Sequence, residues 1–131
     1  MDTVALCPCG SNAPYVSCCG NYVDGKALAA TAEVLMRSRY TAYVLQRDSY
    51  LLATWHPSTR PSTLALQKTK WLGLQVLRHQ QLDETHAIVE FKARYKVQGR
   101  AARLHEISRF VREQERWLYV DGLFPDTSAP L

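Results

Sequence analysis

Hydrophobic and polar residues alternate with a period of two between positions 86 and 97, the most regular pattern in the chain. The apolar or aromatic positions of this alternation are Ala87, Val89, Phe91, Ala93, Tyr95 and Val97. Successive side chains of a strand point to opposite faces, so the pattern predicts a strand with one buried face and one solvated face.

Three further strands are expected around this one. Residues 71–82 are rich in apolar side chains with partial alternation, and residues 103–112 and 117–121 complete the set. Turn-forming residues separate the four segments, at 83–84, 98–100 and 113–115. We expect Asp121-Gly122 to end the last strand in a turn and the remaining residues to form a tail.

The region before residue 70 has helical periodicity instead. One apolar stripe with spacing i, i+4, i+7 and i+8 comprises Met36, Tyr40, Tyr43 and Val44. This stripe predicts a helix over residues 33–46, with Thr31 as its N-cap. Two shorter helices are expected next, over 49–53 with Asp48 as the cap and over 63–68 with Ser62 as the cap.

Helices followed by hairpin-joined strands indicate an α+β fold with an antiparallel meander. Strands of this length twist and bend, so we expect a curved sheet with the helices packed on its concave face, around a cone-shaped pocket. The chain has 131 residues, of which 47% are hydrophobic and 21% charged. This composition fits one compact domain with a small appendage and argues against disorder.

All four cysteines lie in one short N-terminal stretch, as Cys7, Cys9, Cys18 and Cys19. Turn residues between the two pairs bring the sulfurs together, and four thiolates around one point suit tetrahedral Zn²⁺ with no open coordination position. Disulfides are the alternative, but a bond within either pair would close a strained ring, and no apolar signal segment precedes Cys7. We therefore expect one structural zinc ion and a cytoplasmic location, with oxidised or free thiols as the alternative.

This stretch resembles the SEC-C motif, a small zinc module of bacterial proteins, in its Cys-Pro-Cys-Gly-Ser start, its Tyr15 and its Cys18-Cys19 end. The resemblance implies contacts with a protein partner through the module. Residues 12–14 replace the Gly/Lys-rich stretch that takes part in binding an export chaperone in the preprotein translocase ATPase. The resemblance therefore does not extend to that partner.

Three other segments resemble the YchJ family of small bacterial proteins, namely residues 36–40 (MRSRY), 51–58 (LLATWHPS) and 105–110 (HEISRF). The resemblance covers nearly the whole chain. It implies a SEC-C-type zinc module at residues 1–24 and a nuclear transport factor 2-like (cystatin-like) α+β domain at residues 25–131. The family has no established activity, so the resemblance implies a fold and not a reaction.

Charge and hydropathy narrow the range of partners. The net charge is +4, but Lys and Arg are spread along the chain without a run of five. Nucleic-acid binding normally needs a clustered basic face, so a nucleic-acid or ribosome partner is the less favoured expectation. No apolar run reaches the roughly 20 residues that a membrane-spanning helix needs. The oligomeric state has no signature in the sequence.

A second site is expected where the third predicted strand meets the concave side, because Glu106 and Ser108 share a strand face with Leu104 and Phe110. A carboxyl group in an apolar cavity has a raised pKa, which suits acid–base work. The expected ligand pocket comprises Trp55, His56, Tyr95, Glu106, Ser108 and Tyr119. The alternatives are an ion pair of Glu106 with Arg37 or Arg39, and a loop or capping hydrogen bond for His56.

These features favour a non-enzymatic binding or adaptor protein. The four-cysteine module would contact proteins, and the sheet pocket would hold a small ligand or a partner segment. The alternative is a small hydrolase, isomerase or dehydratase that uses Glu106 and His56 as acid and base. No nucleophile with a neighbouring base is visible in the sequence to favour the enzyme.

Overall fold

The structure is a computed structural model that describes residues 5–64, 66 and 68–125. A short 3₁₀ turn, η1 (Tyr15–Ser17), and the single-turn helix α1 (Gly20–Val23) come first. Two helices follow, α2 (Ala32–Val44) and α3 (Asp48–Ala53), and then four strands, β1 (Lys70–Gln81), β2 (His86–Val97), β3 (Arg100–Glu113) and β4 (Arg116–Leu123). The predicted α+β class and the antiparallel meander are confirmed.

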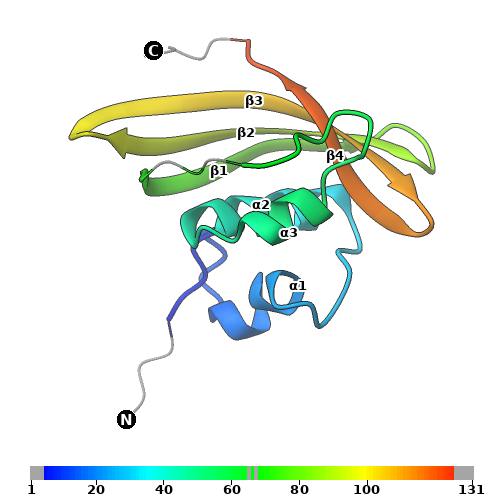
Figure 1. Cartoon of the computed structure of the whole chain (residues 1–131), viewed down its shortest axis with the longest axis horizontal. Helices are drawn as coiled ribbons and strands as arrows, with labels where there is room; N and C mark the ends of the chain where they lie inside the picture. The colour runs from blue at the N-terminus through cyan, green and yellow to red at the C-terminus, as the bar shows by residue number, and fades with distance from the viewer. Residues whose placement is uncertain (1–4, 65, 67, 126–131) are drawn as a thin grey trace.

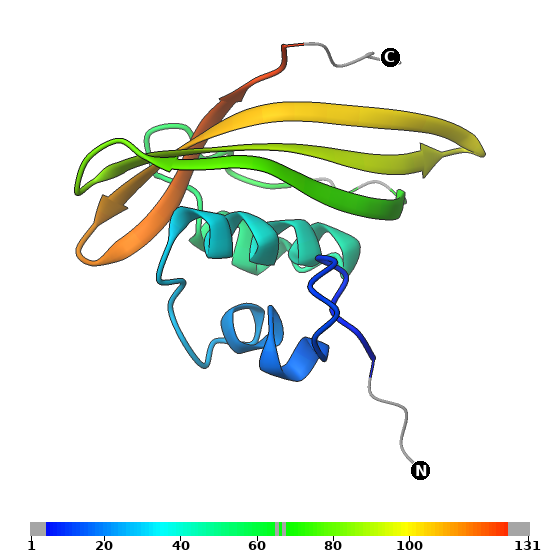
Figure 2. The same cartoon turned by 180° about the vertical axis from the view of Figure 1, so that it is seen from behind.

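The molecule has three layers (Figure 1). The four strands form one sheet in the order β1-β2-β3-β4, and every neighbouring pair is antiparallel. Helices α2 and α3 lie on the concave face of this sheet, and the N-terminal segment with η1 and α1 lies on the far side of α2 (Figure 2). The helix α2 is therefore enclosed between the sheet and the N-terminal segment.

The alternation in β2 explains how the sheet meets the helices. Its inward side chains Ala87, Val89, Phe91 and Ala93 are buried against the apolar side of α2, in one core with Leu35 and Tyr40. Burial of each large apolar side chain contributes about 1.5–3 kcal/mol, so this face stabilises the sheet and the helix together. The alternation continues to Tyr95 and Val97, but both side chains are only half-buried there.

Two of the three predicted helices form, with their ends within two residues of the predicted positions. The side chain of Thr31 accepts a hydrogen bond from the backbone N–H of Val34 at 3.1 Å, which confirms it as the N-cap of α2. Asp48 is the first residue of α3 and not its cap. The described residues between 63 and 68 are not helical, so the third predicted helix is wrong over those positions. A six-residue helix needs tertiary packing to offset the cost of nucleation, which α3 obtains by burying Leu51, whereas the described residues between 63 and 68 are exposed or half-buried.

The end of the last strand also differs from the prediction. Gly122 does not form a turn but lies inside β4, opposite Ser108 of β3. A Cβ atom at this position would stand 2.2 Å from Oε2 of Glu106 and 2.7 Å from its Cδ and Cγ atoms. The glycine is therefore required for space, because the side chain of Glu106 occupies the volume that any larger residue would fill.

No helix within the described residues is long and apolar enough to cross a membrane.

Candidate functional site

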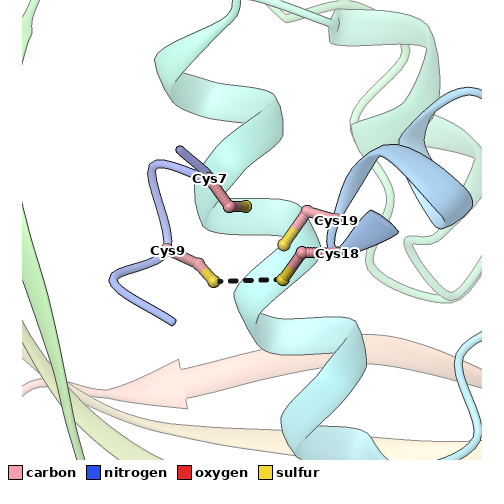
Figure 3. A group of neighbouring side chains, drawn as sticks. All are labelled: Cys7, Cys9, Cys18 and Cys19. Atoms are coloured by element: carbon pink, nitrogen blue, oxygen red, sulfur yellow. Dashed lines mark hydrogen bonds between the residues drawn. The ribbon is translucent and has the colours of Figure 1, made fainter. Parts of the chain in front are cut away.

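The four cysteine sulfurs converge on one point beside α2 (Figure 3). Cys7 and Cys9 come from the loop around Pro8, and Cys18 and Cys19 come from the junction between η1 and α1. The sulfur atoms all lie within 4.8 Å of one another, and Cys9 Sγ is 3.7 Å from Cys18 Sγ. Cys7, Cys9 and Cys19 are buried, so the cluster is largely shielded from solvent.

Backbone conformation explains why this sequence brings the two pairs together. Gly10 has φ +86°, a left-handed conformation in which a side chain is strained, and its N–H donates to the carbonyl of Cys7 at 3.3 Å. The N–H of Cys7 donates to the carbonyl of Ala13 at 2.8 Å and closes the loop. Gly20 leaves no room for a side chain, because a Cβ atom there would stand 2.6 Å from the carbonyl oxygen of Tyr15.

The geometry fits a tetrahedral metal ion. In a tetrahedral site with metal–sulfur distances of about 2.3 Å, neighbouring sulfurs lie about 3.8 Å apart, close to the Cys9–Cys18 distance. Contacts with the neighbouring thiols, that of Cys19 above all, lower the pKa of Cys9 to about 4, whereas the same contact and burial raise the pKa of Cys19. A cation at the centre would favour the thiolate form of all four side chains.

Contacts from α2 hold the cysteine cluster in place. The guanidinium of Arg37 donates through Nη1 to the carbonyl oxygen of Cys9 at 3.1 Å, and its Nε lies 3.1 Å from a carboxylate oxygen of Glu33. On the same side of the helix, Thr41 Oγ1 lies 3.7 Å from Cys7 Sγ. The cluster therefore packs on the helix face that points away from the sheet.

The opposite face of α2 covers a cavity of about 380 Å³ between the helix and the sheet. Aromatic rings make most of its wall, from Tyr40, Tyr43, Trp55, Trp71, Phe91, Phe110, Tyr119 and Phe124. Met36, Ala93 and Leu104 also line it. The polar side chains in this apolar wall include Arg39, Glu106 and Ser108, so the cavity has the composition of a small-molecule site.

Glu106 is the acidic side chain of the cavity and is only 7% exposed. Its Oε2 accepts hydrogen bonds from the hydroxyls of Ser108 at 2.8 Å and Tyr119 at 2.9 Å. Burial raises the pKa of Glu106 above its ordinary value of 4.5, although these two hydrogen bonds and the positive charge of Arg39 oppose the shift. Burial and the Glu106 carboxylate together raise the pKa of Tyr119.

The guanidinium of Arg39 lies over the rings of Trp55 and Tyr119, with Cζ 5.0 Å and 4.6 Å from the ring centroids. Arg39 is charged but only 5% exposed. The sequence held a signal for this, because Arg39 is three residues after Met36 and four before Tyr43. Residues at these spacings share one face of a helix.

Two side chains expected in the pocket lie elsewhere. His56 does not line the cavity; its Nε2 contacts a carboxylate oxygen of Glu113 at 2.8 Å and its Nδ1 contacts the hydroxyl of Ser58 at 2.8 Å. Tyr95 also lies outside the lining and packs against Trp71, with ring centroids 5.4 Å apart. Because Trp55 precedes His56 in an extended segment, the two side chains point in different directions and only the indole reaches the cavity.

The proposed ion pair of Glu106 with an arginine of α2 does not form among the described residues. Arg37 contacts Glu33, and Arg39 donates through Nη1 to the carbonyl of Leu51 at 2.8 Å and to Thr54 Oγ1 at 2.7 Å. Glu106 is therefore stabilised by two hydroxyl groups and not by a direct contact with a cation.

The outer face of the sheet gathers basic side chains that the sequence separates. Lys92 and Arg94 of β2 point away from the core, and Arg94 lies directly opposite Arg103 of β3. These three side chains border a depression of about 320 Å³ on this face. No acidic residue occurs in the sequence between positions 91 and 105, nor between 49 and 82.

A four-cysteine module packed against the helix that covers the cavity of a curved sheet defines a class of SEC-C-containing proteins with an NTF2-like domain. A family model described as the middle NTF2-like domain of YchJ matches residues 31–122. Two solved structures share the fold at 32% sequence identity. One, a SEC-C motif containing protein from Rhodopseudomonas palustris, has a TM-score of 0.84 over 93% of this chain and 100% of its own. The other, a sec-c motif containing protein from Psychrobacter arcticus, has a TM-score of 0.76 over 96% and 84%.

Comparison with curated relatives identifies the family of the chain. A UPF0225 protein of Ralstonia nicotianae is 59% identical over 131 residues and covers 90% of each chain. A UPF0225 protein of Bordetella parapertussis is 57% identical over 122 residues, which are 90% of this chain and 92% of the relative. The chain belongs to the YchJ, or UPF0225, family, as the resemblance of its motifs indicated.

Proposed function

We propose that this protein is a non-enzymatic binding protein of the cytoplasm, in which a zinc-held module contacts a protein partner and the cavity holds a small ligand. The observation that carries the proposal is the cavity itself. It combines about 380 Å³ of space with an aromatic wall and the buried polar groups of Arg39 and Glu106. Pockets of roughly 300–1,000 Å³ with a few convergent polar groups are typical of small-molecule sites.

Zinc is the metal that the four sulfurs favour, because four thiolates at tetrahedral spacing match its usual structural sites. A closed four-sulfur site leaves no position for substrate, which supports a structural role. Elemental analysis of protein purified from zinc-supplemented cells tests this, with one zinc per chain expected and less than one in Cys9→Ser. Protein that contains no bound metal under these conditions would overturn the proposal.

The module is proposed to act as an attachment surface because its outer side is exposed while its inner side is anchored to α2. Leu6 and Val16 are each 60% exposed on this segment. Affinity capture from the native host should recover a partner with the wild-type protein and not with the variant in which all four cysteines are serine. Identical captured proteins in both experiments would place the partner surface elsewhere.

The ligand proposal is tested by blocking the cavity. Leu104→Trp fills it from β3, whereas Ile107→Trp adds the same side chain to the outer face of the same strand. We expect compounds that raise the melting temperature of the wild-type protein to lose this effect in Leu104→Trp and keep it in Ile107→Trp. If both variants retain the effect, the compounds bind outside the cavity.

An enzyme of hydrolase, isomerase or dehydratase type is the alternative, because Glu106 is a buried carboxyl group with a raised pKa inside this cavity. His56 does not line the cavity and contacts Glu113 instead, so Glu106 would be the acid–base group. Turnover of a cavity ligand that is lost in Glu106→Gln, with folding unchanged, would establish the enzyme and replace the binding proposal.

Nucleic-acid or ribosome association is a further alternative, favoured by the basic outer face. Like charges directly opposite in a sheet are destabilising, so Arg94 and Arg103 are the pairing that an anionic partner would compensate. The triple variant Lys92→Gln, Arg94→Gln, Arg103→Gln should weaken binding to a duplex RNA and flatten its salt dependence. A variant that removes three exposed charges elsewhere, at Lys26, Arg60 and Arg112, is the matched control.

A further inference from the structure

The positive charge of Arg39 interacts with the carboxyl group of Glu106 in the same cavity, but only without direct contact. The guanidinium is buried and donates hydrogen bonds to two uncharged acceptors, the carbonyl of Leu51 and the hydroxyl of Thr54. Among the described residues no carboxylate forms an ion pair with it. A guanidinium offers five N–H donors in a planar fork, and both of these hydrogen bonds use the same terminal nitrogen. The other nitrogens of the fork take no part in these two hydrogen bonds and lie beside the Tyr43 side chain, on the cavity side of the helix.

Trp55 supplies a second unsatisfied donor in the same wall. Its ring Nε1 is buried and has no hydrogen-bond partner among the described residues. Buried polar groups are nearly always hydrogen-bonded, so an orphaned N–H beside a cavity indicates a missing acceptor. The Arg39 guanidinium lies over the face of this tryptophan, with Cζ 5.0 Å from the ring centroid, so the two side chains belong to the same part of the cavity wall.

We propose that the cavity binds a small aromatic or apolar carboxylate, whose carboxylate group accepts from Arg39 and Trp55 and whose body lies among the aromatic rings. This inference rests on the proposed use of the cavity as a ligand site. A planar carboxylate matches the guanidinium fork, and charge-assisted hydrogen bonds are about twice as strong as neutral ones. The ligand charge would also compensate the buried cation, which is otherwise costly to keep unpaired.

Glu106 does not oppose this assignment. Its Oε2 is occupied by the hydroxyls of Ser108 and Tyr119. Burial raises the pKa of Glu106, so its neutral form, which can donate a hydrogen bond to an anion, is favoured more than in a carboxyl group exposed to water. Glu106→Gln makes the neutral form permanent, so it should preserve or strengthen binding of a carboxylate.

Indole resonances provide the test. The chain has three tryptophans, and Trp55 and Trp71 line the cavity while Trp117 packs in the core. Three probes of similar size and different charge are titrated into ¹⁵N-labelled full-length protein: benzoate, benzamide and benzylammonium. We expect benzoate to shift the Trp55 indole N–H resonance in a saturable way and to bind at least about tenfold more tightly than benzamide or benzylammonium.

Charge removal in and just after α2 gives the matched variants. Arg39→Gln should reduce the preference for benzoate over benzamide to about onefold, whereas Arg47→Gln removes the same charge from an exposed position just beyond α2 and should leave it unchanged. Glu106→Gln should bind benzoate at least as tightly as wild type. It decides the question if Arg39→Gln fails to fold, because weaker benzoate binding in this variant would contradict the assignment.

The three probes distinguish a cavity that binds ligands without preferring an anion from a cavity that binds no ligand of this size. If all three probes shift the Trp55 and Trp71 resonances with equal affinity, the cavity binds ligands but the preference for an anion is wrong. If benzoate shifts other resonances while that of Trp55 stays in place, the assigned site is wrong. If none of the probes shifts either resonance, the carboxylate assignment fails and the cavity loses its support as a site for compounds of this size.

Discussion

Replacing Gly122 with alanine tests whether the close packing of β4 against Glu106 supports the cavity. The added Cβ would stand 2.2 Å from Glu106 Oε2, so either the carboxyl group or the strand must move. Overpacking of this kind costs about 1–3 kcal/mol. Displacing Glu106 also removes its hydrogen bonds to Ser108 and Tyr119, and a buried polar group left unpaired costs about 1–3 kcal/mol. We expect Gly122→Ala to lower the free energy of unfolding by about 2–6 kcal/mol.

Urea denaturation measures this effect, and the sheet offers a matched control. Gly73 is also a strand glycine, but a Cβ there would meet only the end of the flexible Arg94 side chain, at 3.1 Å. Gly73→Ala should therefore change the free energy of unfolding by less than about 1 kcal/mol. In the Glu106→Ala background the clash disappears, so the effect of Gly122→Ala should shrink by more than half. Equal effects of Gly122→Ala and Gly73→Ala, or full additivity with Glu106→Ala, would refute the reasoning.

Three other perturbations follow from the same contacts. Cys9→Ser should remove the bound metal and loosen the N-terminal module while the sheet core stays folded, because coordination stabilises one and apolar burial the other; a single thermal transition in which both are lost would contradict this. The unfolding free energy of the wild type should decrease as the pH rises from about 4.5 through the raised pKa of Glu106, because the folded state then holds a proton that the unfolded state has released. Glu106→Gln should flatten that part of the stability curve, and an unchanged slope would show that another group titrates there. Thr31→Ala should lower stability by about 1 kcal/mol in chemical denaturation through loss of the N-cap of α2, and no change would show that the observed hydrogen bond contributes nothing.

Three features of this protein could be predicted from the sequence alone, because each depends only on local chemistry: a strand, the cysteine cluster and one face of β3. The alternation over residues 86–97 identifies a strand, because side chains of a strand alternate between faces whatever the rest of the chain does. The four cysteines predict a metal-binding cluster for a similar reason, since all of them lie within thirteen positions and turn residues separate the pairs. The period of two also predicts that Glu106 and Ser108 share one face of β3.

Only the tertiary structure decided which distant side chains share a site. His56 and Trp55 are neighbours in the chain, yet one contacts Glu113 and the other lines the cavity with Arg39. Gly122 resembles a turn residue locally, but a side chain from another strand fills its space. The basic outer face arises because antiparallel pairing places Arg94 opposite Arg103, nine positions away. Such relations depend on register and layer packing, which join residues through space and leave no periodic signal along the chain.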